Sequence, residues 1–284
     1  MFHEQEGYPI DSLCSLLKLS RSSYYYRPIE RQETMLQEAV EEVSARFITY
    51  GSRRVTHELR RHPYELLINR KRIQRLMREM GLLRVQKRRK QHTTDSKHGF
   101  KRYPNLVVDL DITEPDQVWV CDITYIRLHR EFVYLAVIMD VFPRSIRGWN
   151  LSRWLDHSLT LTALERALSV RAPRIHHSDQ GVQYAAREYV DLLKKNHVQI
   201  SMTGRGAPQE NPYAERLIRT IKEEEVNLSD YNDFSDALSQ ISYFIEEIYE
   251  KKRIHSSLGY LTPVEFEHAF RETQVEQLSS LSMA

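Results

Sequence analysis

The first part of the chain repeats apolar residues at helical spacing. The segment 8–26 has leucines at this spacing and favours a helix-turn-helix, and the segment 31–47 predicts a longer amphipathic helix. A third segment, 68–82, begins with Asn69 as a helix cap and ends at Gly81, a residue that commonly stops helices. We therefore expect a small all-α domain at the start of the chain.

The third of these helices separates apolar from cationic side chains. At about 100° per residue, its apolar residues share one side and its cations fall on the other. The apolar residues are Ile73, Leu76, Met77 and Met80, and the cations are Lys71, Arg75 and Arg78. The run 84–102 has no periodicity and predicts a basic linker that includes Lys87, Arg88, Arg89 and Lys90. We predict that these two sets of cations contact DNA.

From about residue 105 the pattern changes to that of strands. Alternating or continuously apolar segments predict three antiparallel strands, and helices and short strands then alternate. This order predicts an α/β fold, a mixed sheet with helices on its faces. The predicted strands are 116–128, 131–140, 144–151, a short strand ending at Asp179, and 198–202; the predicted helices are 157–170, 186–197 and a long helix starting near Pro212.

Charge is distributed very unevenly along the chain. The formal net charge is +2, but residues 51–102 contain 17 Lys/Arg against 4 Asp/Glu, which leaves an acidic remainder. Such a basic block is typical of a part that binds a polyanion. We expect a helical, helix-turn-helix-like DNA-binding region at 1–90, a basic linker at 91–106, a catalytic core at 107–270 and a tail at 271–284.

Composition excludes several classes of protein. With 284 residues, 41% of them hydrophobic, the chain has room for a core and two domains. Its longest apolar run, 132–139, is too short to cross a membrane, and no basic-then-apolar leader precedes it, so we expect a cytoplasmic location. Two cysteines, Cys14 and Cys121, cannot form a disulfide framework or a cysteine-based zinc site.

Three acids are placed where the predicted elements meet. Asp122 lies in the first strand, Asp179 follows a later strand, and Glu215 lies in the first turn of a helix. Sites are usually built at such an edge, and three converging carboxylates need divalent cations to neutralise them, for which Mg²⁺ is suited. We expect Asp179, rather than the neighbouring histidines, to take part in the chemistry of the site. His176 would face the core and His177 the cleft.

These acids and their neighbours resemble a known family. The three acids resemble the DDE signature of integrase-like transposases. They are Asp122 in WVCDITYI, Asp179 in HHSDQGVQY and Glu215 in NPYAERLIRTIKEE, and 35 residues separate the second acid from the third. The chain is similar to second-frame (OrfB) products of bacterial insertion sequences of the insertion-sequence-three family. YGSRRVTHELRR and RIHSSLGYLTPVEF extend the resemblance to nearly the whole chain.

The resemblance implies a fold, a reaction and residue roles. It implies a ribonuclease H-like core with a five-stranded sheet that binds two Mg²⁺, or Mn²⁺, cuts element ends and joins the freed 3'-hydroxyl to another phosphodiester. The three acids would be metal ligands, and Lys222 would contact the terminal DNA, with Arg219 on the same helix face. His177, Gln183, Tyr184 and Asn211 would lie near the site.

Two other functions remain open at this point. A structure-specific nuclease on the same fold would use the same metals with water alone, and a non-catalytic DNA-binding regulator would need only the basic block. For the transposase we expect DNA as the partner, a homo-oligomer in the DNA complex and no membrane. No leucine-zipper heptads occur, so a first-frame (OrfA) product is a further expected partner.

Overall fold

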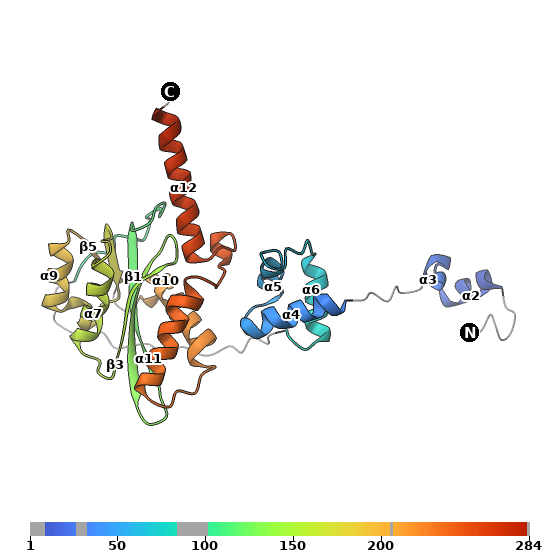
Figure 1. Ribbon diagram of the computed structural model, residues 1–284, viewed down its shortest axis with the longest axis horizontal. Coiled ribbons are helices and arrows are strands. Elements are labelled where there is room, and N and C mark those ends of the chain that lie inside the picture. The colour runs from blue at the N-terminus through green and yellow to red at the C-terminus, as the bar shows by residue number, and fades with distance from the viewer. Residues whose placement is uncertain (1–8, 27–32, 84–101, 205–206, 283–284) are drawn as a thin grey trace.

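The computed structural model describes residues 9–26, 33–83, 102–204 and 207–282 (Figure 1). The described elements before residue 84 are all helices, and a mixed sheet with flanking helices follows from Val118. The early helices are α2 (Ile10–Leu17), α3 (Arg21–Tyr25), α4 (Thr34–Arg46), α5 (Ser52–Leu59) and α6 (Arg70–Glu79). The predicted all-α region is therefore present.

The sheet has five strands in the order β3-β2-β1-β4-β5. The strands are β1 (Val118–Arg127), β2 (Phe132–Asp140), β3 (Ile146–Ser152), β4 (Ile175–Ser178) and β5 (Gln199–Met202). The first three form an antiparallel meander, whereas β4 lies parallel to β1 and β5 parallel to β4. This is the mixed five-stranded sheet that we expected, and β2 is buried along almost its whole length, in agreement with its continuous apolar run.

Helices cover both faces of the sheet (Figure 1). One face packs against α7 (His157–Leu168), α8 (Val182–Ala185) and α9 (Arg187–Lys195). The other packs against α10 (Pro212–Ile221), α11 (Phe234–Tyr243) and the π-helical η3 (Phe244–Tyr249). The remaining elements are η1 (Pro208–Glu210), η2 (Lys222–Val226), η4 (Ser256–Leu258) and α12 (Pro263–Ser282).

Local sequence signals explain where several helices begin. The side chain of Asn69 accepts a hydrogen bond from the Lys71 amide at the start of α6, as its predicted capping role requires. Asp156 caps α7 in the same way by accepting from the amides of Ser158 and Leu159. Both helices therefore begin within two residues of their predicted starts.

Some features differ from the predictions. Helices α5 and α11 were not predicted. In α2, Leu16 and Leu17 are 80% and 58% exposed, although their spacing suggested a packed face. Helix α12 runs through residue 270, so no helix end coincides with the predicted start of the tail there.

The helices α4, α5 and α6 have a core of their own, and one of its members comes from far along the chain. Ile254, which follows η3, is fully buried among the apolar residues of these helices. The early helical domain and the sheet domain therefore contact each other directly.

Candidate functional site

Two of the predicted acids lie where neighbouring parallel strands stop pairing. Strand β1 pairs with β4 from Val118 to Val120, and the last pair joins Val120 to His177. Asp122 and Asp179 each lie two residues beyond that pair. Asp122 and Asp179 therefore lie at equivalent positions just beyond the end of the β1–β4 pairing.

The third acid arrives on α10, which is tied to the same strand. Pro212 begins this helix, and Glu215 lies in its first turn. Just before it, the Asn211 amide donates a 3.0 Å hydrogen bond to the carbonyl of Cys121, next to Asp122. Asn211 is buried, and its Oδ1 has no hydrogen-bond partner within the described structure. This residue thus fixes the start of α10 against β1, next to Asp122.

The electrostatics of Asp122 show that the acids influence one another. Burial, followed by the charges of Asp179 and Glu215, raises the pKa of Asp122 to about 7, and the hydrogen bond from the Ile123 amide and the charge of Lys222 oppose this rise. A carboxylate near two other carboxylates and a low-dielectric interior is poorly stabilised in its charged form. A cation at this edge would reverse that penalty.

The donor set fits a hard divalent cation. It consists of carboxylate oxygens, which Mg²⁺ prefers over the nitrogen and sulfur ligands typical of zinc. In the described parts of the chain, no three His, Cys, Asp or Glu side chains already stand close enough together to hold a metal ion. The three acids therefore share an edge and an electrostatic field without forming a closed ligand cage.

A glycine constrains the orientation of Asp179. The Gly181 amide donates a 2.9 Å hydrogen bond to Oδ1 of Asp179. A Cβ atom at position 181 would lie only 2.9 Å from that same oxygen. Gly181, which we did not predict as a site residue, is therefore needed for this carboxylate orientation.

The two histidines before Asp179 are both buried. His176 faces the core as predicted, where its Nε2 is 2.9 Å from the hydroxyl of Tyr189. The prediction that His177 faces the cleft is wrong: its ring is fully buried, with Nδ1 2.8 Å from Oγ of Ser201 and Nε2 3.3 Å from the carbonyl of Glu210. Burial lowers the pKa of His176 to about 3 and also lowers that of His177, so both rings are neutral near pH 7.

Lys222 lies close to Asp122 but not on the α-helix where we placed it. Helix α10 ends at Ile221, and Lys222 begins the π-helical turn η2. Its Nζ lies 4.6 Å from the ring centroid of the exposed Tyr125. Burial lowers the pKa of Lys222, and the charge of Asp122 opposes that change. Arg219, in the last turn of α10, is exposed.

The two remaining predicted neighbours differ in exposure. Tyr184 is buried, and its pKa is raised by burial and by the nearby Cys121, Asp122 and Asp179. Gln183 is half-buried, and its Oε1 lies 3.4 Å from where a Cβ of Gly181 would be. Both therefore lie around the loop that carries Asp179.

The predicted DNA-contacting cations of α6 are not equivalent. Arg75 is bonded to the buried Glu33 at 2.7 Å and to Glu79 at 3.1 Å, so its charge is already balanced within the protein. Lys71 and Arg78 are exposed. The other predicted cations, Lys87, Arg88, Arg89 and Lys90, lie outside the described residues.

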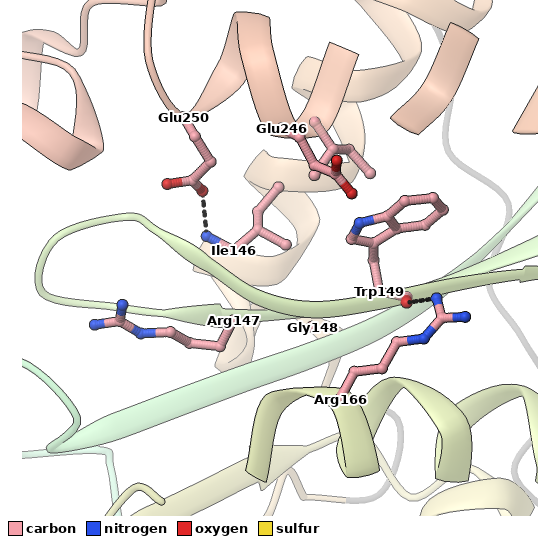
Figure 2. A pocket seen from close by; sticks show the side chains of 8 residues that line it. Ile146, Arg147, Gly148, Trp149, Arg166, Glu246 and Glu250 are labelled. Atoms are coloured by element: carbon pink, nitrogen blue, oxygen red, sulfur yellow. Dashed lines mark hydrogen bonds between the residues drawn. The ribbon is translucent and has the colours of Figure 1, made fainter. Parts of the chain in front are cut away.

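A pocket of about 370 Å³ lies elsewhere, beside the edge strand β3 (Figure 2). It is lined by residues of β3, by Arg166 of α7 and by Glu246 and Glu250, and the acids Asp122, Asp179 and Glu215 do not line it. Figure 2 shows Glu250 accepting a hydrogen bond from the Ile146 amide. The three acids thus lie apart from this pocket.

Family models match most of the described chain. An "HTH-like domain" matches residues 30–90, and two "Integrase core domain" models match residues 112–208 and 196–263. The helix-turn-helix similarity thus covers α4 to α6 rather than α2 and α3.

Curated relatives and solved structures were also compared. The 31 kDa protein of insertion element IS600 from Shigella sonnei is 33% identical, covering 92% of this chain and 99% of that protein. Transposase InsF for insertion sequence IS3A from Escherichia coli K12 is 30% identical, and the match covers 93% of this chain and 96% of that protein. The HTLV-2 integrase catalytic core in complex with magnesium is similar at a TM-score of 0.38 and 17% identity, covering 54% of this chain and 97% of that one.

Within the described residues, no helix is long and apolar enough to span a membrane.

The relatives match along almost their whole length, and the matched models place a helix-turn-helix-like part before an integrase core in the order seen in the fold. The chain belongs to the insertion-sequence transposases with an integrase-type catalytic core.

Proposed function

We propose that this protein is a DNA transposase that cuts the ends of its insertion element and joins the freed 3'-hydroxyl to another phosphodiester. Asp122, Asp179 and Glu215 would hold divalent metal, two Mg²⁺ ions or Mn²⁺ in their place. The equivalent positions of Asp122 and Asp179 beyond the last β1–β4 pair carry this proposal. The raised pKa of Asp122, caused by burial and by Asp179 and Glu215, supports it, because a bound cation would stabilise the charged carboxylate.

Each residue of the site would have a distinct task. Asp122, Asp179 and Glu215 would hold the divalent ions, which would supply activation of the attacking oxygen and stabilisation of the departing one. Gly181 keeps the carboxylate of Asp179 oriented, and Asn211 holds the first turn of α10, and with it Glu215, beside β1. Lys222, next to Asp122 and above Tyr125, would hold a phosphate of the terminal nucleotides.

The expected partners follow from the same arrangement. The exposed Lys71 and Arg78 would bind phosphates of the element end, together with the cations at 87–90. Arg75 would contribute less, since Glu33 and Glu79 already pair with it. Joining two DNA ends calls for at least two copies of the chain, and a first-frame product is a further partner to test.

A labelled DNA end with a free 3'-hydroxyl tests the reaction. With Mg²⁺, the wild-type protein should yield joined products, and Asp122→Asn should lower joining by at least about a hundredfold while DNA binding stays within about twofold. Cleavage without joining in either Mg²⁺ or Mn²⁺ would instead identify a nuclease. Binding without cleavage or joining would identify a regulator.

A further inference from the structure

The helical domain packs against the catalytic domain through hydrogen bonds, a buried apolar side chain and stacked rings. The Ile254 amide donates a 2.9 Å hydrogen bond to the hydroxyl of Tyr50, and the Ile254 side chain is buried among the helical-domain residues. The rings of His57 and Tyr260 stack with centroids 3.5 Å apart. Arg61 donates to the carbonyl of Tyr260. The segments YGSRRVTHELRR and RIHSSLGY therefore form one junction.

At the centre of this junction, one acid binds two arginines from different domains. Glu224 accepts two hydrogen bonds from Arg253, at 2.7 and 2.8 Å, and lies 3.5 Å from the guanidinium of Arg54 in α5. The side chains of Glu224 and Arg253 are only 10% and 2% exposed. Burial raises the pKa of Glu224, but the hydrogen bond and charge of Arg253 outweigh that effect and keep it low. Glu224 is therefore charged, and it forms an ion pair with both guanidinium groups.

Glu224 belongs to the same turn as Lys222. Both lie in the π-helical η2, which follows α10 directly. Residues two apart in a helix point to roughly opposite sides. One side of this turn accordingly carries Lys222 toward Asp122 and Tyr125, and the other carries Glu224 toward Arg54 and Arg253.

A π-helical turn is rare. It occurs mostly as a single turn inside an α-helix and is frequent at functional sites. Pinning the turn by a buried, charge-assisted, bidentate contact limits the positions that Lys222 can take.

We propose that Glu224 is a positioning residue: clamped by Arg54 of the helical domain and by Arg253, it fixes the turn that carries Lys222 beside Asp122. The role of Lys222 at the DNA end rests on the proposed function, whereas the clamp itself does not. Docking of the helical domain thereby sets the geometry of the catalytic edge.

Two matched arginines test the clamp in the full chain. Arg54→Gln removes the contact with Glu224, and Arg53→Gln removes one charge at the exposed neighbouring position. Amide hydrogen exchange in residues 222–226, measured without DNA, should become about tenfold faster in Arg54→Gln and in Glu224→Gln, and stay unchanged in Arg53→Gln. Glu224→Gln leaves two arginines without their acid and is therefore the more disruptive variant. If Glu224→Gln fails to fold, the result for Arg54→Gln alone decides whether the clamp exists. Unchanged exchange in Arg54→Gln overturns the clamp.

DNA-end cleavage tests the consequence for Lys222. Arg54→Gln should lower kcat by about tenfold or more with KM changed less than about twofold, because Lys222 is misplaced rather than lost. Arg53→Gln should at most raise KM. An Arg54→Gln effect confined to KM would make Arg54 a DNA contact and overturn the positioning role. If the wild-type protein cleaves no DNA end, the proposed function fails, and hydrogen exchange still decides the clamp.

Discussion

Asp122 carries an energetic cost that function explains. Its carboxyl lies between a buried strand and two other acids, and its pKa is raised to about 7, mainly by burial and then by Asp179. Such a group favours the neutral form in the folded protein, so its ionisation opposes folding. A site residue that destabilises the metal-free protein is what a metal-binding carboxylate cluster would produce.

This cost predicts how an Asp122→Asn variant melts in the presence of a chelator. Because the folded pKa is above the ordinary value of 3.8, the cost is fully present above pH 7, falls between pH 7 and pH 4, and vanishes below that range. Asp122→Asn should therefore raise the free energy of unfolding at pH 8 by on the order of 2 kcal/mol, and by less at pH 5. Calorimetric melting at the two pH values checks this.

Addition of Mg²⁺ provides the control. It should raise the melting temperature of the wild-type protein and have a smaller effect on the variant, since a ligand that binds only the folded state stabilises it. A variant less stable than wild type at both pH values would contradict the proposed cost of Asp122.

At the scale of single elements, close packing of α7 on β3 depends on one glycine. A Cβ at Gly148 would overlap the carbonyl oxygen of Ala163 and come within 2.9 Å of the Cβ of Ala167. The backbone oxygen belongs to the helix and cannot rotate away. Gly148 therefore permits the close approach of these two elements.

Gly148→Ala should lower the free energy of unfolding by about 1–3 kcal/mol, since strand and helix must move apart. Gly51→Ala is the matched control, because a Cβ there meets no atom within 4 Å. That change should cost less than about 1 kcal/mol, through the start of α5 alone. Chemical denaturation of both variants gives the comparison, and equal costs would rule out the packing explanation.

Element patterns show which parts of the fold were predictable. The strands were, because alternation and continuous apolar runs at 116–151 are long and strong. The change from α- to π-helix at Lys222 was not, since no local signal marks it. Glu215 and Lys222 both act on Asp122, although α10 ends one residue before Lys222.

The same contrast holds for the site and its surroundings. The order and spacing of the three acids indicated a shared edge, and β1 and β4 bring Asp122 and Asp179 to equivalent positions there. Contacts between distant segments could not be predicted. Glu33 pairing with Arg75 and Glu210 meeting His177 both depend on tertiary packing that periodicity does not encode.

At the scale of the whole molecule, the junction joins a basic domain to an acidic one. The formal charge of +2 hides a strongly basic segment at 51–102, and this segment begins at the helix whose Arg54 binds Glu224. The positive charge of this segment would attract a polyanion, and the junction holds the described helices of this region against the sheet domain. Ile254, buried in the core of the helical domain, is the apolar counterpart of this contact.

Ile254→Ala should destabilise the helical domain through a change made in the sheet domain's part of the chain. Removing a fully buried side chain of this size costs about 2–5 kcal/mol. Because the cavity lies among α4, α5 and α6, hydrogen exchange should accelerate in these helices before the strands respond. Ile241→Ala, also fully buried but in the sheet-side core, should accelerate exchange in α11 and the strands it covers. Exchange in α4 to α6 that is the same in Ile254→Ala and wild type would show that the helical domain is stable without the junction.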